Sequence, residues 1–103
     1  MTDQFVDVVQ DEIAEEKAGA LGRSGRRLEQ ALEQFRDYEH ARRRGDSRAD
    51  AKREALLWDL AERVEAFVVH REACGLRDAR RVLEFYGVPR EALARVGVRR
   101  PPR

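Results

Sequence analysis

The sequence has one cysteine, three prolines and no apolar run longer than about four residues. A lone Cys74 excludes an intrachain disulfide and a cysteine metal cage. Runs this short exclude a membrane-spanning helix, which needs roughly 20 consecutive apolar residues. The acidic start, residues 1–4, is also unlike a signal peptide. We therefore expect a cytoplasmic protein that does not enter a membrane.

Motifs for enzyme chemistry are also missing. Gly19, Gly22 and Gly25 lie within a helical pattern, with neither a preceding strand nor a Gly-Lys-Ser/Thr sequence, so they do not form a phosphate loop. No nucleophile motif surrounds Ser24 or Ser47, so a serine triad has no support. The sequence therefore predicts a protein that is not an enzyme and that needs no cofactor.

The two histidines are the remaining candidates for site chemistry. Asp37 and His40 have the three-residue spacing of helical di-iron sites, but such sites need several further carboxylates. His70 and Cys74 are four residues apart, yet two ligands do not make a zinc site, and a helix C-terminus disfavours a thiolate. We predict no metal site. A small thiol- or metal-dependent enzyme at His70 and Cys74 ranks last of three functional hypotheses.

The clearest pattern that is present is a seam of small and apolar residues between residues 14 and 35. They recur at alternating steps of four and three, which is typical of a long helix packed lengthwise against another helix. Glycine in an exposed helix costs about 1 kcal/mol relative to alanine, so the clustered glycines indicate close helix approach. We call residues 18–25 the glycine segment. With Gly22 included from this segment, the oligomer seam comprises Ala14, Ala18, Leu21, Gly22, Gly25, Leu28, Leu32 and Phe35.

Periodicity predicts an all-α fold that begins with two long helices. The first spans about 3–43, with Val6, Val9 and Ile13 leading into the seam, and Gly45-Asp46 follows it. Ser47 or Asp50 caps the second helix, which Gly75 ends. The expected buried face of the second helix comprises Leu56, Leu57, Leu60, Ala61, Val64, Phe67 and Val68, with Trp58 to one side.

A short helical hairpin follows the long helices. Its first helix is expected over 77–86, with Asp78 as a possible cap and Gly87 as its end. Pro89 opens the second helix and Gly97 closes it. We expect a single helical domain over residues 1–98 and a flexible basic tail over 99–103.

The unequal lengths of the long helices predict self-association. A helix of roughly 40 residues is about 60 Å long, whereas the second helix offers only about 27 residues to cover it. A second copy of the chain would cover the rest of the first helix. This would give an antiparallel or crossed dimeric helix bundle, or a tetramer built from two dimers. The glycine segment is the expected crossing point.

Charge is distributed unevenly along the chain. Residues 1–16 hold six acidic residues and no basic one, whereas the chain from Leu76 onward holds eight arginines and three acidic residues. The basic end could meet the acidic start of a neighbouring chain or an external polyanion. The candidate nucleic-acid contacts are Arg77, Arg80, Arg81, Arg90, Arg95, Arg99 and Arg100.

Residues 77–96 resemble a degenerate helix-turn-helix. Gly87 and the apolar Val88 stand where such units turn. However, Leu83 is bulky where the two helices usually touch, and the second helix, 89–96, is short for reading bases. An ordinary helical hairpin and a DNA-reading unit both remain open, the hairpin being favoured.

Two blocks resemble a family of small uncharacterised proteobacterial helical proteins. They are EKAGALGRSGRRLE at residues 16–29 and REACGLRD at residues 71–78, continuing to YGVPRE at residues 86–91. The resemblance implies a cytoplasmic bacterial helical protein and carries no activity or cofactor. The sequence predicts a non-enzymatic homo-oligomeric interaction or adaptor protein with an unidentified protein partner. The alternative is a DNA-binding protein that uses residues 77–96.

Overall fold

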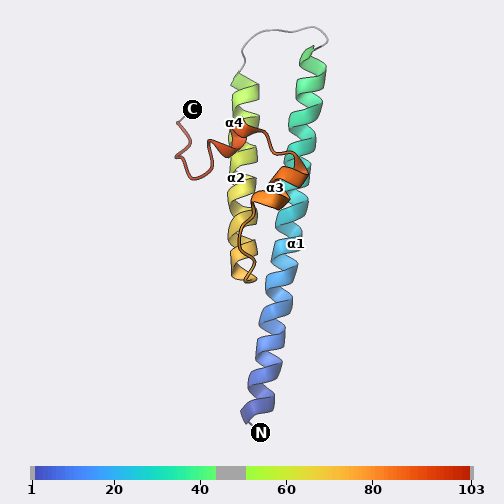
Figure 1. Ribbon diagram of the computed structural model, residues 1–103, viewed down its shortest axis with the longest axis vertical. Coiled ribbons are helices and arrows are strands. Elements are labelled where there is room, and N and C mark those ends of the chain that lie inside the picture. Colours follow the sequence, from blue (N-terminus) through green and yellow to red (C-terminus); the bar gives the residue numbers. More distant parts are fainter. Residues whose placement is uncertain (1, 44–50, 103) are drawn as a thin grey trace.

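The computed structural model describes residues 2–43 and 51–102, and these residues form helices and turns without any strand. Two long helices run side by side in opposite directions, and a short helical hairpin crosses them near the middle of the molecule (Figure 1). The predicted all-α fold is confirmed, including the order of two long helices and a short hairpin. The elements are α1 (Thr2–Arg43), α2 (Ala51–Ala73), α3 (Arg80–Tyr86) and α4 (Arg90–Leu93).

The ends of the long helices agree with the glycine pattern. α1 reaches Arg43, as expected, and it continues without a break through the glycine segment. α2 stops at Ala73, and Gly75 follows in the left-handed region at φ +80°. The amide of Leu76 then donates to the Arg71 carbonyl at 2.9 Å, which satisfies an end carbonyl of the helix. The proposed boundary residues 45–50 lie outside the described part of the chain.

α3 begins three residues later than the sequence predicts. Asp78 has φ +54°, which places it outside the helix, and its Oδ1 accepts a hydrogen bond from the Arg80 amide at 3.2 Å. Asp78 therefore still supports the first turn of α3. Gly87, at φ +71°, ends α3 with its amide bonded to Glu84, and Pro89 precedes the single turn of α4.

The core lies where the hairpin of α3 and α4 covers one face of the α1–α2 pair. Leu28, Leu57 and Leu60 are fully buried there. Of the expected buried face of α2, Leu56 and Val68 are only half-buried. The core cluster comprises Leu28, Leu32, Phe35, Leu57, Leu60, Val64, Phe67, Leu83, Val88 and Ala92.

The seam divides into a buried part and an exposed part. From residue 25 onward its members pack within the chain, and Leu21 is half-buried at the boundary. Ala14, Ala18 and Gly22 are exposed. The assignment of the whole seam to an oligomer contact is therefore corrected, since α2 of the same chain covers its second half.

The glycine segment also differs from its expected role. A Cβ added at Gly25 would meet the Phe67 ring at 3.5 Å, which is an ordinary contact. Cβ atoms at Gly19 and Gly22 would meet only arginine side chains of α1 itself. Within one chain, close helix packing therefore does not require these three glycines.

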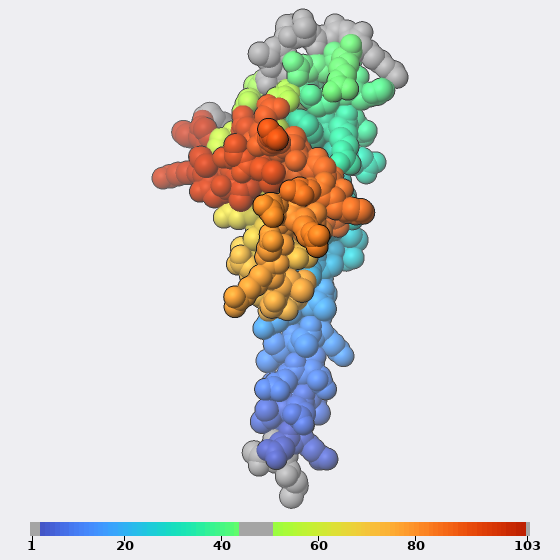
Figure 2. Space-filling view, in the orientation of Figure 1, coloured from blue at the N-terminus to red at the C-terminus, as the bar shows by residue number. Residues whose placement is uncertain are grey.

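The beginning of α1 extends beyond the end of α2 as a free arm, defined here as residues 3–18 (Figures 1 and 2). Phe5, Val8 and Ile13 on this arm are 71 %, 53 % and 49 % exposed. The chain has a surface of 8030 Å² and a radius of gyration of 17.6 Å. A compact protein of this size would have about 5,900 Å² and about 13 Å. The arm therefore leaves apolar surface exposed that a compact chain would bury.

Candidate interaction surfaces

A second stripe of apolar and small residues runs along α1, roughly a quarter turn away from the seam. Val6, Ile13 and Ala20 follow one another at steps of seven residues, Ala31 comes eleven later, and Tyr38 seven after that. Steps of seven and eleven return to nearly the same face of an α-helix. We call this set, together with Val9, the outer stripe. Val6, Val9 and Ile13 thus belong to the outer stripe and do not lead into the seam.

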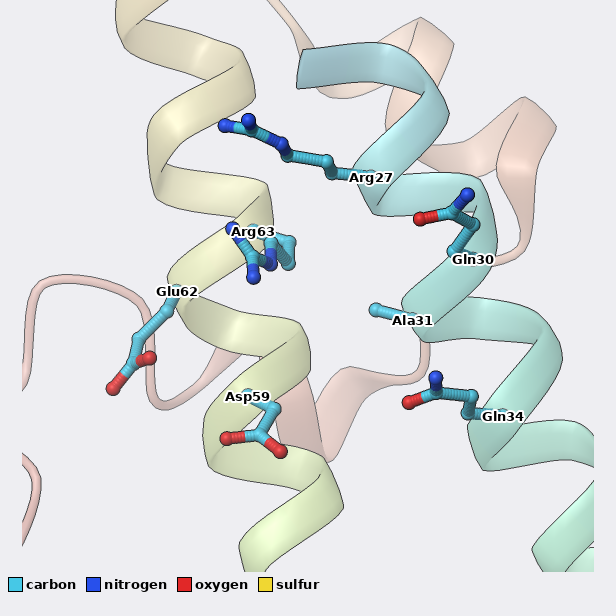
Figure 3. Close-up of a pocket in the computed structure, with 7 residues that line it drawn as sticks. All are labelled: Arg27, Gln30, Ala31, Gln34, Asp59, Glu62 and Arg63. Atoms are coloured by element: carbon cyan, nitrogen blue, oxygen red, sulfur yellow. The ribbon is translucent and has the colours of Figure 1, made fainter. Parts of the chain in front are cut away.

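Between α1 and α2 the outer stripe borders a hollow of about 230 Å³. Figure 3 shows Arg27 extending from α1 toward α2, with Ala31 and Gln34 pointing the same way. The rim of this hollow carries charges of both signs. Arg27 and Arg63 are positive, and two acidic side chains of α2 are negative. The complete lining is Arg27, Gln30, Ala31, Gln34, Asp59, Glu62 and Arg63.

A second hollow of about 410 Å³ adjoins the first, because Gln34 lines both. Tyr38 and Leu56 give it an apolar surface, and Lys52 and Asp37 stand beside them. Both hollows therefore lie along the outer stripe, on the part of α1 that α2 accompanies. We call this side of the α1–α2 pair the open face.

Two of the exposed seam residues, Ala14 and Ala18, line a third hollow, of about 450 Å³, where the arm leaves α2. Ala14, Ala18 and Ile13 face Cys74 there, at the end of α2. Cys74 is half-buried and not in a disulfide. Across the described ranges 2–43 and 51–102, no group of three or more histidine, cysteine, aspartate and glutamate residues is placed to hold a metal ion.

Two of the candidate nucleic-acid contacts are engaged within the chain. Arg95 donates from Nη2 to Glu54 at 2.9 Å and lies over the Trp58 ring, 5.6 Å from its centroid. Arg100 donates from Nη1 to Asp59 at 2.8 Å, and this hydrogen bond raises the pKa of Arg100. These two side chains hold the C-terminal segment against α2.

The other five candidates, Arg77, Arg80, Arg81, Arg90 and Arg99, are exposed and form no ion pair with any residue that the structure describes. On α3, Phe85 is 85 % exposed and lies four residues after Arg81, so the two share one helix face. The expected second helix of a DNA-reading unit is the single turn Arg90–Leu93. This turn is too short to insert a helix into a major groove and present several side chains to bases.

The arm, the outer stripe and the α3 face are thus the surfaces that could meet other molecules. No family model, curated protein or solved structure matches this chain. None of the described helices combines the length and apolar character needed to cross a membrane. Sequence reasoning missed the outer stripe, although its steps of seven and eleven residues were visible in the sequence.

Proposed function

We propose that this chain is a non-enzymatic, cytoplasmic interaction or adaptor protein that works as a homo-oligomer built on its long helices. The observation that carries the proposal is the free arm. It exposes Phe5, Val8 and Ile13 on a helix that α2 does not accompany, apart from the hollow where Ile13, Ala14 and Ala18 lie near Cys74. Monomeric proteins rarely expose large apolar patches, so several exposed apolar side chains on one helix favour a partner.

A separate surface on α3 supports the adaptor role. Among the large apolar side chains that the structure describes, Phe85 is the most exposed, and Arg81, which pairs with no described acidic residue, lies beside it. An exposed aromatic next to arginine is a frequent anchor for a protein partner. A partner suited to this face would carry acidic and apolar side chains, and α3 lies away from the arm, so both surfaces could be occupied together.

The molar mass in solution tests the homo-oligomer. Light scattering coupled to size exclusion should give about twice the 11.9 kDa of the chain, or four times for a tetramer. A monomeric mass at tens of micromolar protein would contradict the proposal. Phe85→Ser serves as the control, since it alters the α3 face and should leave this mass unchanged.

DNA binding is the second candidate, and the five unpaired arginines favour it. Fluorescence anisotropy of a labelled mixed-sequence duplex should show a steep salt dependence if these arginines contact phosphates. The double change Arg80→Ala and Arg81→Ala should then reduce the salt slope by about 2. Arg23→Ala on α1 is the matched control. Absence of binding at low salt would remove this candidate.

The thiol hypothesis is tested by Cys74→Ser. We expect unchanged stability and no zinc in either protein, because the described residues provide no third ligand near His70 and Cys74. Zinc that copurifies with the parent protein and is lost from the variant would revive the hypothesis.

A further inference from the structure

We infer that two copies of this chain pair antiparallel along α1, so that the arm of each copy lies on the open face of the other. This inference rests on the proposed self-association and adds the surfaces, the direction and the register. The spacing of the outer stripe, the distribution of charge and the exposed area support it independently.

The spacing of residues in the outer stripe determines which positions of the two copies face each other. Val6 and Ile13 on the arm are seven residues apart, and so are Ala31 and Tyr38 beside the two hollows. Seven residues correspond to about 10 Å along a helix. In an antiparallel pair, Ile13 of one copy then faces Ala31 of the other while Val6 faces Tyr38. The arm thereby brings its apolar side chains to the two hollows, which are otherwise open.

The same register places the two-fold axis at residue 22, between the facing positions 13 and 31. Ala20 is the member of the outer stripe nearest to this axis, and its small side chain permits close approach of two helices. The axis therefore falls within the glycine segment, where the sequence predicts the crossing, although the contact is made by the outer stripe.

Charge favours the antiparallel direction. The arm carries six acidic residues and one lysine, whereas residues 19–43 carry six arginines and four acidic residues. A parallel pair would set two acidic arms side by side, while an antiparallel pair sets each arm against the more basic half of α1. Within one chain Glu16 makes only a 3.4 Å contact with the exposed Arg23. In the proposed pair it comes close to Arg27 of the second copy.

The exposed area is sufficient for a stable pair. The surface of 8030 Å² exceeds that of a compact chain of this mass by about 2,000 Å². A standard protein interface buries about 800 Å² on each partner. The surface that the whole chain exposes in excess is therefore larger than one partner's share of an ordinary interface.

Disulfide trapping tests the register. In a Cys74→Ser background, Ile13→Cys and Ala31→Cys proteins are mixed and oxidised with copper phenanthroline. We expect a covalent dimer that contains one copy of each variant, in excess over dimers of either variant alone. Asp11→Cys mixed with Glu33→Cys is the matched control, because these exposed residues have the same register but lie on the opposite face of α1. The control pair should not be trapped preferentially.

A spin label at Asp11 provides a second measurement that leaves the proposed interface intact. Two labels are separated by about 33 Å along the axis of the antiparallel pair, whereas in a parallel pair they lie at the same height and only the width of the helix pair separates them. A dimeric mass with a short label distance, or with no preferred linkage between positions 13 and 31, would overturn this geometry and leave self-association standing. A monomeric mass would overturn both.

Discussion

Arg53 on α2 holds Glu91 on α4 with two hydrogen bonds, from Nη1 at 2.7 Å and from Nη2 at 2.8 Å. Its Nε also donates to Glu39 on α1 at 2.6 Å, so one guanidinium joins three helices. These bonds raise the pKa of Arg53, and the bond from Arg53 lowers the pKa of Glu91. The single turn of α4 is therefore fixed by charge as well as by the buried Ala92.

Glu91→Gln should reduce the free energy of unfolding at neutral pH by up to about 1 kcal/mol, because the pair is partly exposed and screened by solvent. The lowered pKa means that Glu91 contributes its full stability at pH values above the ordinary pKa of a glutamate. That contribution is lost as pH falls through the lower folded value. Urea unfolding should therefore show the parent and variant converging in acid.

Glu84→Gln is the control for this prediction, since Glu84 is exposed on α3 and makes no ion pair with a described residue. It should change neither the stability at neutral pH nor its acid dependence. If the difference in the free energy of unfolding between Glu91→Gln and the parent stayed constant from neutral to acid pH, the ion pair with Arg53 would not be the cause of that difference.

Gly87→Ala should destabilise the fold by about 1–2 kcal/mol, because Gly87 has φ +71° and side chains other than glycine are strained there. The added Cβ would also lie 3.1 Å from Nη2 of Arg36, which donates to the Tyr86 carbonyl. Gly97→Ala isolates the backbone strain, since Gly97 has φ +77° and nothing within 4 Å of its Cβ position. The difference between the two variants therefore reports the contact with Arg36. Thermal unfolding should show the larger loss for Gly87→Ala.

The turns could be predicted from the sequence because their cause is local. Gly75 and Gly87 adopt the left-handed backbone that their position after a helical pattern indicates. The start of α3 could not be predicted, because Asp78 occupies a left-handed conformation that residues other than glycine adopt infrequently. The periodicity of apolar residues carries no information about such a choice.

Leu60→Ala should lower the free energy of unfolding by about 2–5 kcal/mol, because it leaves a cavity among side chains that cannot collapse into it. Leu60 is 0 % exposed, on the face of α2 that the sequence predicts to be buried. Leu76→Ala is the comparison, at a position 43 % exposed, and should change stability by less than about 0.5 kcal/mol. Equal losses in urea unfolding would contradict the described core.

The interaction surfaces were harder to predict than the core. Leu28 and Leu32 belong to a dense seven-residue pattern, and the pattern identifies them as buried whichever helix covers them. The pattern does not indicate whether the covering helix comes from the same chain or from a second copy. For this reason the pattern wrongly assigns the second half of the seam to an oligomer contact. The outer stripe is sparser, with Arg27 interrupting it between Ala20 and Ala31, so its steps of seven and eleven residues are a weaker signal in the sequence than the seam.

Ile13→Glu should abolish self-association, whereas Val8→Glu should preserve it. The two side chains are 49 % and 53 % exposed on the same arm, but only Ile13 belongs to the outer stripe. For a dimer that dissociates on unfolding, each tenfold rise in protein concentration adds about 1.4 kcal/mol of stability per dimer. Melting temperatures measured over a concentration series should therefore rise for the parent and Val8→Glu and stay constant for Ile13→Glu. If both variants behaved alike, the contact would depend on the apolar character of the whole arm, and the one-sided surface proposed for it would be wrong.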